Sequence, residues 1–147
     1  MDISKVRQKY QDALDGLAHN TRKVYGYDRP VLIEGGLYPG IWLECGPLEG
    51  LVYGRHVPEI AYANHDIFFR LQREDGYLPC WVRTDRMGSA QIQMVVPIAA
   101  TALETAEMLG DEQFLARAYA ACARWDRWLS TYRNTRGTGL CEAFCEY

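Results

Sequence analysis

No apolar run in this sequence approaches the ~20 residues that a membrane-spanning helix needs. The first residues also lack the basic and then apolar layout of a secretory signal peptide. A basic patch is missing as well, because the 16 basic residues, only three of them lysines, are interleaved with 19 acidic ones and the formal net charge at pH 7 is −3. Proteins that bind nucleic acid usually carry a basic face. We therefore expect a cytoplasmic protein whose partners include neither nucleic acid nor a membrane.

The residue spacings typical of metal and phosphate sites are also missing. Cys141 and Cys145 lie close together, but a zinc site usually needs a second close pair of Cys or His, and the three histidines are scattered. The glycine pairs of residues 35–36 and 137–139 lack the lysine and the spacing of a P-loop. We therefore expect no metal and no cofactor, and we interpret the five cysteines as reduced thiols, mostly small apolar side chains.

What the sequence does contain is a helical repeat of apolar residues. The long segments that show it are residues 3–17, 58–73, 89–109 and 111–132, and Pro47 can open a shorter helix over residues 47–53. Gly110 and Asp111 suit the end of one helix and the start of the next, which predicts a tight helical hairpin. Pro97 implies that its helix either kinks or begins near that residue. The predicted fold class is all-α, built from antiparallel helical hairpins.

Three long segments between these helices are rich in glycine, aromatic residues, arginine and acids. They are residues 35–45, 75–88 and 134–147. The glycines and prolines of the first segment predict irregular structure. If the helices alternate in direction, all three segments lie at the same end of the helical layer. Long loops on a rigid scaffold often carry binding sites, which favours an enzyme domain over a simple helical bundle.

The aromatic and acidic residues of these loops are typical of a carbohydrate site. The aromatic residues are Tyr38, Trp42, Tyr77 and Trp81, and the acids around them are Glu34, Glu44, Glu49, Asp75 and Asp85. Sugars offer apolar faces for aromatic rings and hydroxyl groups for carboxylates and amides, the latter available from Gln91 and Gln93. Arg83 and Arg86 can bind an acidic group on a substrate. In the alternative interpretation, the tryptophans only cap the helical core and the arginines are solvated.

Three motifs, taken in order, resemble the amino-terminal part of the six-hairpin glycosidases. They are Trp42-Leu43-Glu44, Gln72-x-x-Asp75-Gly76-Tyr77-Leu78-Pro79 and Ser89-Ala90-Gln91-Ile92-Gln93. The chain is most similar to glycoside hydrolase family 63 and its mannosylglycerate-hydrolase-like relatives, whose catalytic domain is an (α/α)6 toroid. The resemblance covers residues 35–147, which would form the first part of that domain. Residues 1–34 would then form an amino-terminal helix and a linker.

The resemblance also implies roles for individual residues. Trp42 would stack on the sugar near the bond that is cleaved, and Gln93, or alternatively Gln91, would match the family's loop glutamine. Where the family has Trp-Asp, this chain has Trp42-Leu43-Glu44, so Glu44 would hold the substrate if a carboxylate is kept there. The complete predicted substrate site consists of Tyr38, Trp42, Glu44, Trp81, Arg83, Gln91 and Gln93.

No catalytic residue is assigned. Inverting hydrolysis of a glycoside needs two carboxyl groups about 6.5–9.5 Å apart, and Glu142 and Glu146 lie in one loop where they do not obviously flank a sugar. The resemblance implies a general acid just beyond the fourth long helix and a base much later. We predict the amino-terminal portion of an inverting α-glycosidase, inactive by itself. The alternatives are a polysaccharide lyase on the same toroid and a non-catalytic helical domain that binds a carbohydrate or a partner.

Overall fold

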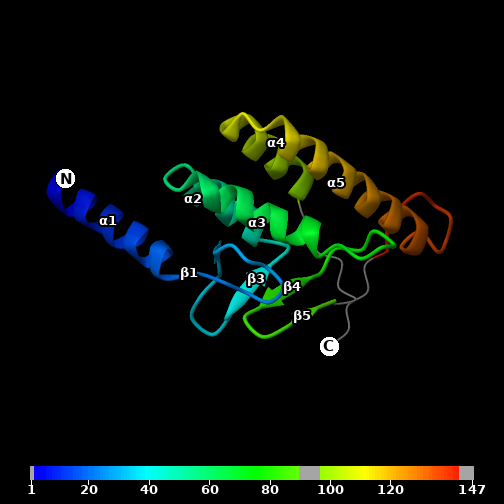
Figure 1. Ribbon diagram of the computed structural model, residues 1–147, viewed down its shortest axis with the longest axis horizontal. Helices are drawn as coiled ribbons and strands as arrows, with labels where there is room; N and C mark the ends of the chain where they lie inside the picture. The colour runs from blue at the N-terminus through cyan, green and yellow to red at the C-terminus, as the bar shows by residue number, and fades with distance from the viewer. Residues whose placement is uncertain (1, 90–96, 143–147) are drawn as a thin grey trace.

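The computed structural model describes residues 2–89 and 97–142 (Figure 1). The helices are α1 (Ile3–His19), α2 (Gly46–Gly54), α3 (Pro58–Arg70), α4 (Ile98–Leu109) and α5 (Glu112–Tyr132). The strands are β1 (Thr21–Arg22), β2 (Val31–Leu32), β3 (Gly40–Trp42), β4 (Trp81–Arg83) and β5 (Met87–Gly88). The fold is mostly helical, as the apolar repeat predicts. Gln91 and Gln93 lie outside the described residues.

Two antiparallel helical hairpins, α2–α3 and α4–α5, form the body of the molecule. Gly110 has a left-handed φ of 63° at the end of α4, and the Asp111 side chain accepts a hydrogen bond of 2.8 Å from the Phe114 N–H at the start of α5. These are the predicted helix cap and N-cap. Both short turns lie at one end of the helices, and the longer segments leave from the other end (Figure 1). Pro97 is the N-cap of α4, so the described helix begins at Ile98 rather than continuing through the proline.

Helix α3 lies between the α4–α5 hairpin and the strands, and it is buried along most of its length (Figure 1). Ile67 and Phe68 are fully buried in the main core, and the Phe69 ring lies 6.3 Å from the ring of Phe114 on α5. Its buried polar side chains have partners, as burial requires. Asn64 accepts a hydrogen bond from the Leu32 N–H at 2.9 Å and donates to the carbonyls of Leu32 and Gly46. This one side chain therefore fixes β2 and the start of α2 against α3.

The prediction of irregular structure for residues 35–45 is wrong at residues 40–42, and the loop predicted for residues 75–88 is wrong at residues 81–83 and 87–88. Strands β3, β4 and β5 form a small antiparallel sheet in that order. Ile41 of β3 and Val82 of β4 face each other and are fully buried. Pairing between segments about 40 residues apart depends on tertiary packing, and strands this short carry little local signal.

Helix α1 extends away from this body (Figure 1). No described residue of α1 is buried, but Leu14 and Leu17 pack against Leu32, Tyr53 and Ile60. β1 then pairs with β2, which joins the helix to the body. Within the described parts of the chain, no helix is both long and apolar enough to cross a membrane.

Candidate functional site: an aromatic face on the small sheet

The register of the small sheet brings together three of the predicted site residues. Trp42 pairs with Trp81, and Gly40 pairs with Arg83. Directly opposed residues of an antiparallel pair share a face, and alternate residues of a strand share it too. Because the intervening pair of Ile41 and Val82 points into the core, the three side chains of Trp42, Trp81 and Arg83 lie on the opposite face. We call these three residues the aromatic platform.

Glycines in the neighbouring strands leave room for the platform. Gly88 of β5 pairs with Trp81, and a Cβ atom at Gly88 would overlap the Trp81 ring. The indole therefore lies across the bare backbone of Gly88. A Cβ atom at Gly40 would lie 2.7 Å from the Val82 carbonyl oxygen, so β3 approaches β4 closely at this point. Both contacts need glycine because they leave no space for a side chain.

Tyr38 joins the platform from the turn before β3. Gly35 and Gly36 have positive φ values of 81° and 58°, which fold the chain back so that the Tyr38 N–H bonds to the Gly35 carbonyl at 2.9 Å. The Tyr38 ring meets the Trp42 ring edge-on, with centroids 5.6 Å apart. Tyr38 is 58% exposed, so most of its ring is available to a ligand. Four predicted site residues from two distant segments therefore lie together.

A cluster of acids and a thiol adjoins the platform. The Cys45 thiol donates a hydrogen bond of 2.6 Å to Glu34 Oε1, and the Trp42 backbone N–H also bonds to that carboxylate. Burial raises the pKa of Glu34, and the nearby charge of Glu44 adds to this effect. Burial likewise raises the pKa of Glu49 and of the Cys45 thiol, which keeps the thiol protonated as a donor. Glu34 is thus a link between Trp42 and Cys45.

Glu34 and Glu49 are missing from the predicted substrate site. The only signal for them in the sequence is their position among the loop aromatics, which does not separate a buried acid from a solvated one. Glu44, which is predicted as the substrate-holding carboxylate, is exposed. Among the residues that the structure describes, the Arg83 Nε atom is buried and has no hydrogen-bond partner.

Comparison with known proteins identifies the family of the chain. Residues 51–145 match the family model described as the mannosylglycerate hydrolase MGH1-like glycoside hydrolase domain. The chain belongs to this glycoside hydrolase family. No curated protein shows significant similarity to it. Trp81 and Arg83 fall inside the matched residues, whereas Tyr38, Trp42 and Glu44 precede them.

The Asp75-Gly76-Tyr77 motif has a structural part in this glycoside hydrolase chain. The Asp75 carboxylate accepts hydrogen bonds from the Tyr77 N–H at 3.2 Å and from the Trp128 indole at 3.1 Å. Gly76 has a φ of 99° and lies against the backbone of α5 at Arg124. Tyr77 is buried against Trp128, with centroids 4.5 Å apart. The motif therefore attaches the loop before β4 to the end of α5, and its tyrosine is unavailable to a ligand.

The described residues contain no group of three or more His, Cys, Asp and Glu side chains suited to a metal ion. Cys45, Cys122 and Cys141 are free thiols, and Cys145 lies outside the described residues.

Proposed function

We propose that this glycoside hydrolase chain forms one wall of the sugar site in an inverting α-glycosidase. The observation that carries the proposal is the pairing of Trp42 with Trp81 on the outer face of the sheet, with Arg83 beside them. Two adjacent indoles can cover the apolar face of a sugar ring, and placed polar groups at the rim give the site its specificity. Tyr38 extends the aromatic surface on one side.

The polar groups at the rim suit a substrate that carries an acidic group. The guanidinium of Arg83 has a buried Nε donor without a partner among the described residues, and arginine binds a carboxylate through two parallel hydrogen bonds. Glu44 is exposed next to the platform, and its carboxylate is available to accept hydrogen bonds from sugar hydroxyl groups. Gln91 and Gln93 stay predicted contributors of amide contacts. In this proposal, the Glu34 carboxylate orients Trp42 by accepting a hydrogen bond from the Trp42 backbone N–H, and it does not touch the sugar.

The acid and base of the reaction are not assigned among these residues. An inverting enzyme needs two carboxyl groups on opposite sides of the bond, with space for a water molecule between one of them and the sugar. After burial, the charge of Glu34 raises the pKa of Glu49, and both carboxylates raise the pKa of the Cys45 thiol, so the two acids lie near one another. We propose that the catalytic pair comes from other parts of an (α/α)6 toroid. Exposed apolar residues on α4 and α5, including Leu103, Leu115 and Tyr119, support further helices packing there.

The test uses the full-length natural protein with a panel of α-glycosides that carry acidic aglycones. Proton NMR of the first product should show the β-anomer, as inversion requires. Trp42→Ala should lower kcat/KM at least about tenfold, since burying an aromatic ring contributes about 1.5–3 kcal/mol. Tyr10→Ala, which removes an exposed aromatic side chain from α1, is the control and should leave kcat/KM unchanged.

Three results would contradict the proposal in distinct ways. Retention of the α-anomer would exclude the inverting mechanism. Release of an unsaturated product that absorbs ultraviolet light would indicate a lyase. Equal losses in Trp42→Ala and Tyr10→Ala would show that the platform does not hold the sugar.

A further inference from the structure

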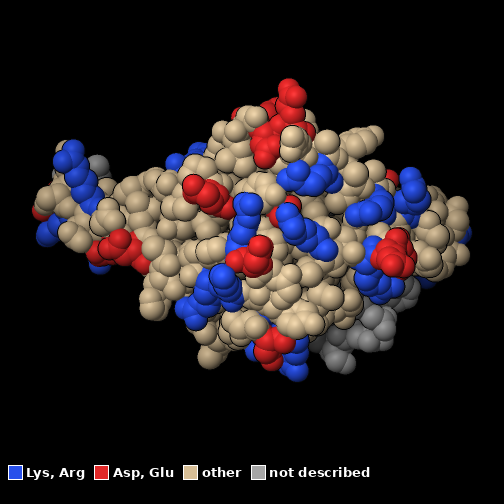
Figure 2. All heavy atoms as spheres, in the orientation of Figure 1, with Lys and Arg blue, Asp and Glu red and all other residues tan. Residues whose placement is uncertain are grey.

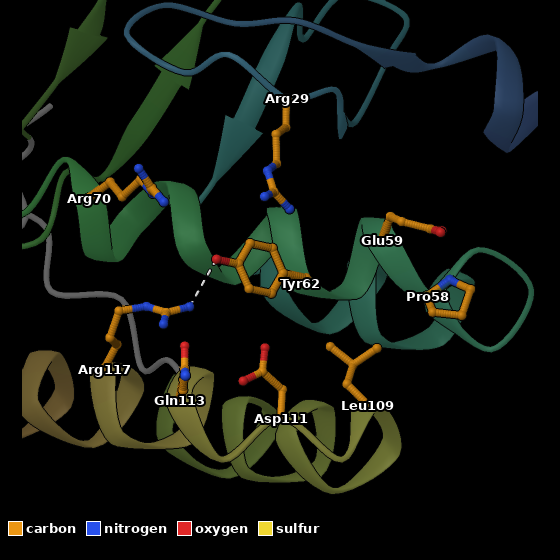
Figure 3. Close-up of a pocket in the computed structure, with 9 residues that line it drawn as sticks. All are labelled: Arg29, Pro58, Glu59, Tyr62, Arg70, Leu109, Asp111, Gln113 and Arg117. Carbon is orange, nitrogen blue, oxygen red and sulfur yellow. Dashed lines mark hydrogen bonds between the residues drawn. The ribbon is translucent and has the colours of Figure 1, made fainter.

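A groove between α3 and α5 is separate from the aromatic platform. It has a volume of about 590 Å³ and is bounded by α3, the start of α5 and the segment that contains Arg29 (Figure 3). None of the described residues that line it belongs to β3, β4 or β5. A ligand in this groove would therefore not compete for the surface formed by Trp42 and Trp81.

Two guanidinium groups lie against one tyrosine ring in the groove. The Cζ atoms of Arg29 and Arg117 are 4.8 and 5.9 Å from the centroid of the Tyr62 ring. Arg117 also donates a hydrogen bond of 2.9 Å from Nη2 to the Tyr62 hydroxyl, as Figure 3 shows. Contact with the ring face orients a guanidinium without using its in-plane N–H donors. Both arginines therefore keep donors available for a ligand.

The charges of these two arginines are not balanced by ion pairs. Across residues 2–89 and 97–142, neither Arg29 nor Arg117 forms an ion pair with a carboxylate. Arg70, which also lines the groove, differs because its Nε donates to the buried Asp66 carboxylate at 2.6 Å. Two like charges held near one ring repel each other, and an anion bound beside the ring would offset that repulsion. The pair of Arg29 and Arg117 is therefore suited to an oxyanion.

The groove offers hydrogen-bond acceptors beside its cations. Asp111 and Gln113 lie across the groove from Tyr62, and Glu59 lies on α3 (Figure 3). Asp111 Oδ1 accepts the Phe114 N–H, which leaves its second oxygen available. Carboxylates repel an anion but accept hydrogen bonds from hydroxyl groups. The groove thus combines a site for an oxyanion with acceptors for hydroxyls.

A second cavity extends the basic side of the groove along α5. It has a volume of about 430 Å³, shares Arg70 and Arg117 with the groove, and adds Arg124. Arg124 is held by Gln72, whose side-chain oxygen accepts from its Nε at 2.9 Å. Figure 2 shows basic side chains gathered over α3 and α5 on this face, with a few acids among them. The basic surface is therefore wider than the arginine pair alone.

We propose that this groove is a second ligand site, which binds a hydroxylated anion: a sugar acid or a sugar phosphate. The oxyanion lies beside the Tyr62 ring and accepts hydrogen bonds from the Arg29 and Arg117 guanidinium groups. The hydroxyl groups of the same ligand donate to Glu59 and Asp111 and contact the Gln113 amide.

Isothermal titration calorimetry on the full chain tests this proposal. The probes are glucuronate, mannose phosphate, unmodified glucose and inorganic phosphate. We expect one of the first two to bind, and its identity shows whether the anion is a carboxylate or a phosphate. Glucose and inorganic phosphate should each bind at least about tenfold more weakly, because each lacks one half of the interaction. Added salt should weaken binding, since the arginines are exposed.

Variants locate the binding. The double variant Arg29→Gln with Arg117→Gln should lose affinity at least about tenfold. The matched control, Arg7→Gln with Arg127→Gln, removes the same charge from exposed positions outside the groove and should bind as the parent does. Arg29→Lys keeps the positive charge in an exposed segment. Its affinity should lie between those of the two double variants, because lysine cannot make the two-point contact. Thermal melting confirms that each variant is folded.

Several outcomes would overturn the proposal. They are absence of binding at millimolar probe, equal losses in the two double variants, and inorganic phosphate or glucose binding as tightly as the sugar anions. An Arg29→Lys variant that binds like the parent would overturn the two-point contact. Loss of binding in Trp42→Ala would place the ligand on the platform instead of in the groove.

Discussion

His65 should make the stability of this protein depend on pH in a way that one substitution removes. The side chain is fully buried on α3, its Nδ1 lies 2.8 Å from the Ala61 carbonyl, and its Nε2 lies 2.9 Å from the Thr101 hydroxyl. A neutral ring satisfies both contacts when Nδ1 donates to the carbonyl and Nε2 accepts from the hydroxyl. Burial lowers the pKa of His65 from 6.5 to about 4, because the charged ring would lose its hydration.

The sign and the size follow from that pKa. The unfolded chain takes up a proton at His65 below pH 6.5, whereas the folded protein resists protonation until about pH 4. The contribution to stability is therefore complete above pH 6.5 and is lost as the pH falls toward 4. One pKa unit corresponds to about 1.36 kcal/mol. Through this one group, the free energy of unfolding should therefore fall by about 2.5 kcal/mol as the pH is lowered from about 7.5 to about 4.5.

Urea denaturation at several pH values measures this effect. The free energy of unfolding of the parent includes contributions from every carboxylate, so the informative quantity is its difference from His65→Gln. That difference should shrink by about 2.5 kcal/mol between the two pH values, whatever the substitution costs at neutral pH. His19→Gln, at the exposed end of α1, is the control. A His65→Gln variant with the same pH dependence as the parent would refute a buried neutral histidine.

Two further predictions concern the platform. Gly88→Ala should displace the Trp81 ring and cost about 1–3 kcal/mol of stability from overpacking, measured by thermal unfolding and by near-ultraviolet circular dichroism. Gly16→Ala, in an open part of α1, should instead be neutral or stabilising, and an unchanged Gly88→Ala would contradict the contact. Because the raised pKa of Glu34 makes its ionisation unfavourable in the folded state, Glu34→Gln should gain stability relative to the parent as the pH rises above about 4.5. Urea denaturation checks this, with the exposed Glu104→Gln as the control, and a relative loss of stability would be the contrary result.

The helices were predictable because their signals are local. The apolar stripe of α5 and its Asp111 cap lie within one segment, and Gly110 has the left-handed φ that its residue type favours. Pro97 allowed two predictions, a kinked helix or a helix that begins near the proline. The helix begins just after it, as its missing N–H and its restricted φ favour.

The site was predictable in composition but not in geometry. The sequence indicates that Tyr38, Trp42, Trp81 and Arg83 belong to one site, yet nothing local pairs Trp42 with Trp81. That register keeps Ile41 and Val82 both buried, because a shift of one strand by one residue would turn its tryptophan into the core and its buried residue outward. The groove was not predictable at all, since it forms only when three separate segments bring Arg29, Tyr62 and Arg117 together.

The position of α3 explains how one small fold can hold two separate sites. One side of α3 is tied through Asn64 to β2 and α2, which lead into and out of β3 and so position the platform. Tyr62 and Arg70, on the same helix, face the groove toward α5. Because the residues between them are buried and satisfied, a change at Arg29 or Arg117 should not move the sheet. The two sites should therefore respond independently to substitution. The double variant of Trp42→Ala and Arg117→Gln should show at each site the same change in binding free energy as the single variant at that site.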